Sequence, residues 1–386
     1  MTHDVIVVGS GVTGASTAFQ LAERRAGDVL VLDQGAAGSG MSSRSSALIR
    51  MHYTFPPEVQ LAVRSDGIFS RWPEVVGAGG VVKRTGFARI VMPGEESNLR
   101  ENVKMQQSLG ADTRIVTGEE LAEIAPGLLV DDVAEAAYEP NGGFGDGAVV
   151  AGDFMAAARR RGVRFRPGTP IRALLTEGDR VVGVEKDDGP EHAGTVVLAT
   201  GVWSRPLLRD IGFHAPIECE LHHVAILRNG PAGGAPLACI DSVTATYFRP
   251  EGSGETTLVG SFEGGRPAAP ADADAPVDQD ALAELAEAAS RRLPALEEAG
   301  VARGVRGVYD MTPDARPMIG RLPGLEGLVV AVGFSGMGFK ISPAVGEAVA
   351  DLVVGDGPSW IDMHPFRPNR FAEGDLVVPP FPYADD

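Results

Sequence analysis

The sequence predicts an α/β protein (α+β overall) in which a parallel-sheet domain of the doubly wound kind is interleaved with an antiparallel-sheet domain. Three observations predict this fold. A glycine-rich turn joins an apolar strand to a helix at 4–33, and a second strand, glycine loop and helix follow at 328–345. Between them, residues 216–262 alternate between apolar and polar side chains, as antiparallel strands do.

The first turn has the spacing of a dinucleotide-binding fingerprint. The apolar run 5–8 leads into Gly-Ser-Gly-Val-Thr-Gly at 9–14, and a helix and a second strand follow, ending at Asp33. Gly9 makes the tight turn, Gly11 lets the backbone approach a pyrophosphate, and Gly14 lets helix and strand pack closely. The helix N-terminus favours the pyrophosphate, and Asp33 accepts from the ribose hydroxyls. The segment therefore predicts a Rossmann-like domain.

The other elements follow from periodicity. Helices are predicted at 57–72, 99–109, 154–161 and 281–292, and from Ser342 onward, where a capping side chain precedes a first-turn proline. Strands are predicted at 87–92, 163–165, 171–175, 181–184, 195–200, 224–227, 245–249, 257–259 and 328–332. The Ala/Pro/Asp-rich stretch at 267–277 predicts a surface loop.

Segments typical of a cofactor domain recur at the start, middle and end of the chain, so two interleaved domains fit better than two consecutive ones. The boundaries predicted are 1–85, 145–215 and 305–360 for the cofactor domain, and 86–144 and 216–304 for the substrate domain. Residues 361–386 are predicted to form an irregular C-terminal strap.

Composition excludes several classes of partner. A formal net charge of −18 argues against nucleic acid, because phosphate binding needs basic patches. Two cysteines make neither a disulfide framework nor a metal site of recognisable spacing, which favours a reduced, cytoplasmic setting. The apolar start lacks the basic region of a signal peptide, and no apolar run reaches the roughly 18 residues of a membrane span.

The late glycine loop distinguishes between two cofactors. Residues 333–340 join a buried strand to a helix, so backbone amides can approach a ligand there as well. A plain NAD enzyme has no obvious use for this second loop. In an extended FAD the loop lies at the flavin end, where the helix dipole favours negative charge on the reduced ring. The sequence therefore predicts FAD.

Several motifs in fixed order resemble the FAD-dependent D-amino-acid-oxidase-like family, and most closely its sarcosine oxidase, dimethylglycine dehydrogenase and glycine oxidase branch. Beyond the fingerprint these are S-A-L-I-R at 46–50, A-T-G at 199–201, Y-F-R-P-E-G at 247–252, G-V-Y-D-M-T-P-D at 307–314, R-P-M-I-G at 316–320 and G-F-S-G-M-G-F-K at 333–340. The last is close to the motif of monomeric sarcosine oxidases.

The resemblance implies an enzyme that oxidises a secondary or N-methylated amino acid, or a related amine. Hydride would pass to flavin N5 and the imine formed would be hydrolysed, with oxygen or an electron carrier reoxidising the flavin. Two alternatives remain open: oxidation of a D-amino acid or a 2-hydroxy acid, and an FAD subunit of a multi-subunit dehydrogenase. A monomer or homodimer is expected otherwise.

Five residues carry the expected chemistry. Arg50 and Lys340 match the family's partners of the substrate carboxylate, a pairing of guanidinium fork and ammonium that would fix its orientation. Tyr309 matches a tyrosine of the substrate pocket, and Tyr247 lies on a strand near it. Met337 stands where sarcosine oxidases have histidine, which implies a pocket shaped for a different amine substituent.

The expected cofactor residues lie in the glycine loops and the segments beside them. They are Gly9, Gly11, Val12, Thr13, Gly14, Asp33, Gln34, Ser42, Ser43, Arg44, Ser46, Ala47, Ile171, Thr200, Gly201, Trp203, Gly333, Gly336, Met337, Gly338, Phe339 and Lys340.

Three departures from the family pattern sharpen these expectations. Gly307 replaces the cysteine through which some relatives attach flavin, and no histidine lies at 42–46, so FAD is expected to bind noncovalently. No lysine lies between Lys186 and Lys340, so the oxygen-activating lysine of the branch is absent. Another cation, such as His222, His223 or Arg249, could replace it, or the enzyme could pass electrons to a different acceptor. No metal is expected, because adjacent histidines on a strand point to opposite faces.

Overall fold

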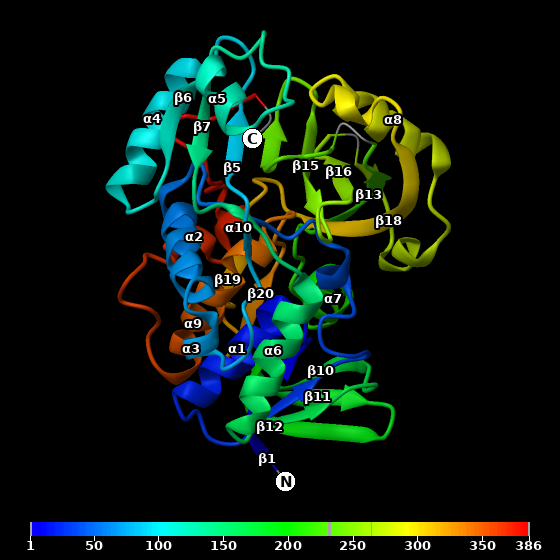
Figure 1. The fold of residues 1–386 in the computed structure, drawn as a ribbon. Coiled ribbons are helices and arrows are strands. Elements are labelled where there is room, and N and C mark those ends of the chain that lie inside the picture. Colours follow the sequence, from blue (N-terminus) through cyan, green and yellow to red (C-terminus); the bar gives the residue numbers. More distant parts are fainter. Residues whose placement is uncertain (1, 231–232, 264, 385–386) are drawn as a thin grey trace.

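The computed structural model describes residues 2–230, 233–263 and 265–384. Two large sheets lie one above the other along the long axis of the molecule (Figure 1). Among the described residues, no helix has the length and apolar character needed to cross a membrane.

The lower sheet has eight strands, in the order β10-β11-β12-β1-β2-β9, with β20 beside β12 and β19 beside β20. The pairs of β1 with β2 and β12, of β12 with β20 and of β2 with β9 are parallel. Their apolar runs are buried on both faces, as in parallel sheets covered by helices. The bounds are β1 (Thr2–Val8), β2 (Val29–Leu32), β9 (Arg164–Arg166), β10 (Ile171–Glu177), β11 (Arg180–Lys186), β12 (Gly189–Leu198), β19 (Met318–Arg321) and β20 (Leu328–Val332).

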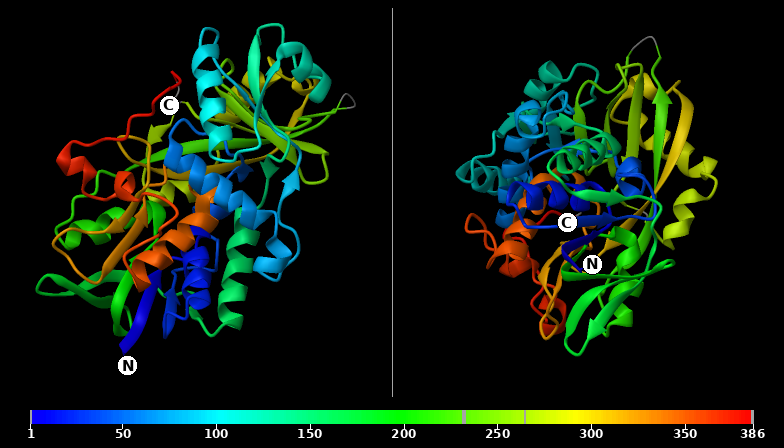
Figure 2. Two further views of the ribbon diagram at one scale, coloured as in Figure 1. Left: turned by 90° about the vertical axis from the view of Figure 1, so that its left-hand side faces the viewer. Right: turned by 90° about the horizontal axis from the view of Figure 1, so that it is seen from below.

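Helix α1 (Val12–Glu23) packs between α9 (Gly338–Val354) and α6 (Gly147–Arg160) (Figure 2). The approach to α9 is very close, because a Cβ atom built on Gly346 would lie 2.1 Å from Ser16 Oγ. Helices α2 (Pro56–Phe69) and α3 (Trp72–Val75) lie outside α9. The buried face of α1 thus joins the first glycine turn to α9.

The upper sheet has nine strands, in the order β17-β13-β16-β15-β14-β5-β7-β6, with β18 on the other side of β13. Helix α8 (Gln279–Ser290) packs on β13, β15 and β16, while α4 (Glu96–Ser108) and α5 (Gly118–Ile124) pack on β6 and β7. The bounds are β5 (Phe87–Ile90), β6 (Arg114–Thr117), β7 (Glu135–Glu139), β13 (Glu218–Arg228), β14 (Ala238–Asp241), β15 (Thr246–Glu251), β16 (Thr256–Ser261), β17 (Arg266–Pro267) and β18 (Gly300–Met311).

Each sheet is built from segments far apart in the chain, in the interleaved manner that the sequence predicts. A small third sheet of β3 (Leu48–Ile49), β8 (Gly143–Phe144) and β4 (Lys83–Arg84) lies where the chain passes between the two large sheets. The predicted boundary at 305 falls inside β18, whose whole length pairs with β13. Strand β18 therefore runs from the upper sheet directly into the lower half.

Helix α9 begins at Gly338, four residues before the predicted start at Ser342, with Met337 at the N-cap position. Pro343 has no N–H group to donate to the carbonyl of Phe339 one turn earlier. The Ser342 hydroxyl donates to that carbonyl instead, at 2.8 Å. The Ser-Pro pair therefore lies inside the helix, and Lys340 falls in its first turn.

The stretch at 267–277 is not the plain surface loop that was predicted. Residues Pro270–Asp274 form a 3-10 turn in which Ala273 is buried. The Arg44 guanidinium holds this turn by donating to the Ala273 carbonyl at 2.6 Å and to the Asp274 carboxylate. An anchored turn looks like a loop in the sequence because its anchor lies more than 200 residues away.

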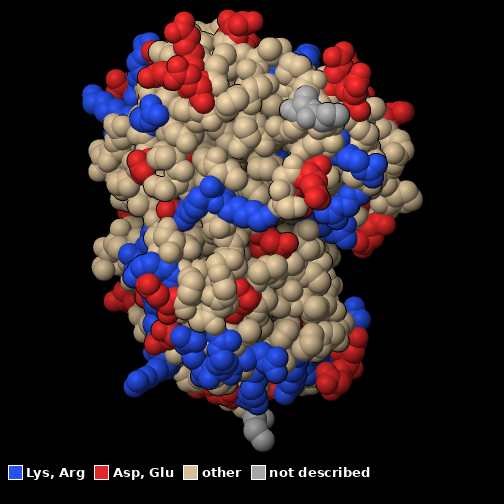
Figure 3. All heavy atoms as spheres, viewed as in Figure 1, with Lys and Arg blue, Asp and Glu red and all other residues tan. Residues whose placement is uncertain are grey.

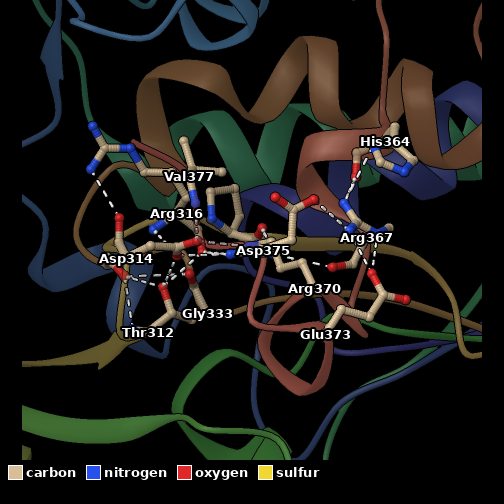
Figure 4. Close-up of polar contacts among 12 residues, drawn as sticks. Thr312, Asp314, Arg316, Gly333, His364, Arg367, Arg370, Glu373, Asp375 and Val377 are labelled. Carbon is tan, nitrogen blue, oxygen red and sulfur yellow. Dashed lines mark hydrogen bonds and ion pairs between the residues drawn. The ribbon is translucent and has the colours of Figure 1, made fainter. Parts of the chain in front are cut away.

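The C-terminal strap runs from the lower half to the upper sheet (Figure 2), and Figure 4 shows its polar contacts around Asp314. Arg370, in the short helix α10 (Arg370–Glu373), is fully buried, and its guanidinium donates to both oxygens of Asp314 at 2.8 and 2.9 Å. Farther on, the hydroxyl of Tyr383 lies 3.0 Å from Nε2 of the buried His52, and the two rings stack. The strap is therefore packed against both halves.

Replacing Arg370 by alanine leaves the Asp314 carboxylate, 1% exposed, without its buried partner. We expect Arg370→Ala to lower the free energy of unfolding by roughly 3–5 kcal/mol, measured by urea denaturation. Arg209→Ala, which removes an exposed ion pair with Asp210, is the matched control and should change it by about 1 kcal/mol or less. Similar losses of the free energy of unfolding in both variants would show that the buried pair stabilises the protein no more than the exposed pair does.

Candidate active site

A single cavity of about 620 Å³ brings the two predicted glycine loops together. Its walls come from the fingerprint turn, the ends of β2 and β12, strand β18 and the start of α9. The volume falls in the range of small-molecule and cofactor pockets. It lies at the ends of the parallel strands of the lower sheet, where open α/β sheets bind their ligands.

The fingerprint glycines are required by close backbone contacts. Gly9 has a φ of +99°, and a Cβ atom there would lie 2.3 Å from the Ala199 carbonyl oxygen. A Cβ atom on Gly14 would lie 2.0 Å from the Gly9 carbonyl oxygen, so α1 touches the turn directly. The N–H of Val12, the first residue of α1, donates to Ser42 Oγ at 3.0 Å. The helix N-terminus is thereby held against the cavity wall.

The Asp33 carboxylate lies at the end of β2 and lines the cavity. It accepts hydrogen bonds from the Ser10 N–H at 2.6 Å, the Ser10 hydroxyl at 2.8 Å and the Gly35 N–H at 2.7 Å. A carboxylate can accept about four, so capacity remains for a hydroxyl of a bound ligand. These bonds fix the orientation of the carboxylate before any ligand arrives.

Most of the predicted cofactor residues line this cavity. Those that do are Gly9, Gly11, Val12, Thr13, Asp33, Gln34, Ser42, Arg44, Ile171, Thr200, Gly201, Trp203, Gly336, Gly338 and Phe339. Those outside its lining are Gly14, Ser43, Ser46, Ala47, Gly333, Met337 and Lys340. Of the predicted catalytic residues, Tyr309 lines the cavity, while Arg50, Tyr247, Met337 and Lys340 lie outside its lining.

Arg44 lines the cavity, but its guanidinium is directed at protein. It donates to the carbonyls of Ala273 and Arg306, at 2.6 and 3.2 Å, and pairs with Asp274. Pro270 and Asp274, in the turn so anchored, form part of the cavity wall. The residue predicted to bind the cofactor therefore holds a wall segment that sequence reasoning missed.

Tyr309 connects the cavity to a group of buried rings. Its ring lies against the second glycine loop, since a Cβ atom on Gly336 would be 2.7 Å from Tyr309 Cε2. It stacks on His222 with ring centroids 4.2 Å apart, and its hydroxyl is hydrogen-bonded to that of Tyr247. Burial raises the pKa of both tyrosines, so both hydroxyls stay protonated at neutral pH. His222 is buried and His223 is partly exposed, as expected for opposite faces of β13.

Asp310, next to Tyr309, was not predicted. It lines the cavity, and its carboxylate accepts from the Gly333 N–H at 2.8 Å, while its carbonyl accepts from the Ser335 N–H at 3.2 Å. Burial raises its pKa to about 6, against the opposing effect of the N–H groups that it accepts from. Asp310 thus fastens the end of β18 to the second glycine loop.

Arg50 and Lys340 form a group of like charges beside the cavity. Lys340 follows Gly338 and Phe339, which line the cavity, in the first turn of α9. The Arg50 guanidinium carbon lies 4.3 Å from the centre of the Tyr53 ring. Burial lowers the pKa of Lys340 well below its usual range, and the charge of Arg50 lowers it further. A guanidinium and an amine that disfavour each other's charge in this way would be stabilised by a bound anion.

A second, shallow groove is lined by arginines at the lower end of the molecule, where basic side chains gather (Figure 3). Arg164 is paired with Asp28 and Arg166 with Glu191. Much of the groove's positive charge is therefore neutralised within the protein. The groove offers a weaker anion site than the pair of cations beside the cavity.

The cavity fits an extended dinucleotide such as FAD. One end of the site has the α1 N-terminus and the oriented Asp33 carboxylate, which suit a pyrophosphate and a ribose. The second glycine loop, held by Asp310, adds a close backbone approach elsewhere in the same cavity. A dinucleotide that ended at a nicotinamide would have no obvious need of this loop.

Comparison with known proteins gives the same picture. A family model described as FAD dependent oxidoreductase (DAO) matches residues 4–352. The chain is 28% identical over 368 residues to 4-methylaminobutanoate oxidase (formaldehyde-forming) of Paenarthrobacter nicotinovorans. That alignment covers 92% of this chain but only 44% of the relative. It is 26% identical over 387 residues to sarcosine oxidase subunit beta of Arthrobacter sp, in an alignment that covers 97% of this chain and 93% of that subunit. Among solved structures, L-proline dehydrogenase from P. horikoshii superposes with a TM-score of 0.90 at 28% identity. The superposition covers 97% of this chain and 99% of the dehydrogenase chain.

Asp310 gives the site a pH-dependent contribution to stability. Its folded pKa of about 6 lies above its ordinary 3.8, so its contribution is full below about pH 4 and is lost as the pH rises through 6. We expect the stability of wild type relative to Asp310→Asn to fall by roughly 3 kcal/mol between these limits, measured by urea unfolding at each pH. Asp280→Asn, on the exposed start of α8, is the control; a pH-independent difference for Asp310→Asn would contradict the assignment.

Proposed function

This chain belongs to the FAD-dependent oxidoreductase family, and from that premise we propose that it oxidises a secondary or N-methylated amino acid, or a related amine, to an imine that water hydrolyses. The observation that carries the proposal is the pair of cations, Arg50 and Lys340, beside a cavity that fits FAD. A substrate with a carboxylate would supply the anion that this pair attracts.

The residues that would hold FAD are those of the two glycine loops. The first turn of α1 would face the pyrophosphate, Asp33 a ribose, and the loop at 333–338 the flavin. The chemistry that bound FAD supplies is the acceptance of a hydride equivalent from the substrate. The protein's own task is then to position the substrate and to exclude water.

Arg50 and Lys340 would position the substrate by its carboxylate. A guanidinium fork binds a carboxylate in one plane, while an ammonium adds a point charge without a fixed direction. Together they would leave one C–H bond directed toward the flavin. Tyr309 would form the opposite wall, with its hydroxyl held by Tyr247.

The relatives support an amine as substrate. The substrates named in the three proteins compared are 4-methylaminobutanoate, sarcosine and L-proline. All three are secondary amines that carry a carboxylate. Because the names include both oxidases and dehydrogenases, oxygen and an electron carrier both remain candidates for the acceptor.

A second candidate function is that of an FAD subunit within a larger dehydrogenase. It is favoured by the similarity to a protein named as a subunit, over 93% of that subunit's length. The two candidate functions predict different assemblies, and only the first predicts turnover without other subunits. A monomer or homodimer that turns over alone would exclude the second.

Anaerobic reduction of the purified flavoprotein tests the substrate class. We expect N-methylglycine, proline or pipecolate to remove the visible absorbance of oxidised flavin, while 2-hydroxy acids and D-amino acids with primary amines do not. Admitting air afterwards tests oxygen as acceptor in the same sample. Reduction by the hydroxy acids alone would overturn the amine proposal.

Arg50→Ala should remove the forked partner of the substrate carboxylate. We expect KM for the best amino-acid substrate to rise about 100-fold, as for the loss of one member of a buried charge pair, with FAD still bound. Arg64→Ala, which removes an arginine stacked on Trp360, is the control and should leave KM unchanged. Equal KM values in wild type and Arg50→Ala would remove Arg50 from the substrate site.

A further inference from the structure

Arg50 lies between two residues that are held by a single turn. Strand β7 ends at Glu139, and the chain turns back from there into β8. Ile49, immediately before Arg50, pairs with Gly143 of β8. Met51, immediately after Arg50, donates its backbone N–H to Oε2 of Glu139 at 2.8 Å. The turn between β7 and β8 therefore fixes the backbone on both sides of Arg50.

The same turn packs against a residue that flanks the Arg50 side chain. The Arg50 guanidinium carbon lies 4.3 Å from the centre of the Tyr53 ring and 5.9 Å from that of Phe87. Phe87 of β5 stands directly opposite Glu139 of β7, so their side chains lie on one face of the upper sheet. A Cβ atom on Gly142 would lie 2.4 Å from Phe87 Cβ, so the turn touches this residue directly. The guanidinium thus lies beside two rings, one of which belongs to a residue that the turn holds in place.

Glu139 is close to Arg50 but does not pair with it. The Glu139 side chain is 0% exposed, and its Oε1 accepts no hydrogen bond from the described residues. Nor does the guanidinium of Arg50 form an ion pair within that part of the chain, where its Nε is buried without a partner. Burial raises the pKa of Glu139 to about 8, against the opposing effects of the Met51 N–H and the Arg50 charge, so the carboxyl group is largely protonated at neutral pH. The charge of Arg50 is therefore left to attract another anion.

We propose that Glu139 is a positioning residue that holds Arg50 in place for the substrate carboxylate by accepting from the Met51 N–H. The inference rests on the proposed role of Arg50 in substrate binding. A charged partner would compete with the substrate for the guanidinium, whereas a hydrogen bond to the next peptide group fixes Arg50 and leaves its charge available. Glu139 then supplies a hydrogen-bond acceptor rather than a charge, and glutamine at this position should supply the acceptor as well.

The test measures binding, without turnover, to the FAD-loaded enzyme at neutral pH. Cyclopentanecarboxylate is a proline analogue with no oxidisable amine, and cyclopentanecarboxamide is its uncharged counterpart. Both would be titrated with the visible absorption of the flavin as readout. We expect Glu139→Leu, which removes the acceptor, to weaken binding of the carboxylate at least about tenfold and to leave binding of the carboxamide unchanged, because only the carboxylate depends on Arg50.

Further variants separate positioning from charge and from general damage. Glu139→Gln keeps the acceptor, so the carboxylate should bind within about threefold of its wild-type affinity. In an Arg50→Ala background, Glu139→Leu should add no further loss, because the two changes act on one interaction. Glu135→Leu, at the other end of β7, removes an ion pair with the exposed Arg100 and should leave carboxylate binding unchanged.

The outcomes separate this inference from the function on which it rests. Equal carboxylate binding in wild type and Glu139→Leu would overturn the role of Glu139 and leave the proposed function standing. A large change in Glu139→Gln would overturn it too, because that variant alters the charge and keeps the hydrogen bond. If Glu139→Leu does not fold, Glu139→Asp takes its place: its carboxyl group is one methylene too short for the same bond, so undiminished carboxylate binding would contradict the proposal. Failure of the carboxylate to bind wild type would overturn both the carboxylate site and the role of Glu139.

Discussion

The structure depends on how closely α1 approaches the backbone on two sides. At one end Gly14 rests on the carbonyl of Gly9, and along its side Ser16 rests on Gly346 of α9, at distances that leave no room for a Cβ atom. These contacts fix the position of α9 relative to the fingerprint turn. Because α9 carries Lys340 and follows the second glycine loop, the same contacts set the distance between the two ends of the cavity.

Three buried arginines are each paired with a carboxylate in the interior. Arg370 with Asp314, Arg292 with Asp241 and Arg316 with Glu58 each bury a cation against a carboxylate. A buried charge without a partner is costly, so such pairing is expected. Arg50 and Lys340 differ from these pairs, since the charge of Arg50 lowers the pKa of Lys340. An excess of one sign beside a cavity is the usual mark of a ligand site rather than of a structural pair.

The sequence predicts those parts of the fold whose conformation is determined by residues close together in the chain. The strand–glycine–helix units have close backbone contacts that only glycine permits, so their signal is complete within about 30 residues. Arg44 and the turn at Pro270–Asp274 could not be predicted in the same way, because their partners lie far apart in the chain. The start of α9 was misplaced because Ser-Pro resembles a cap, whereas the Ser342 hydroxyl replaces a bond that Pro343 cannot make. Asp310 and Glu58 carry no motif, and only packing shows where their carboxylates lie.

The interleaved domains explain why residues that lie far apart in the sequence meet at one place in the structure. Strand β18 brings Tyr309 and Asp310 from the upper sheet to the second glycine loop, and the chain then continues to Asp314 and Arg316 before it enters β19. The strap returns to this same point, where Arg370 binds Asp314 and the carbonyl of Arg316. Arg316 in turn pairs with Glu58 of α2. A continuous series of buried polar contacts thus runs from the C-terminal strap through Arg316 to the first turn of α2, so the strap helps to hold that helix in place.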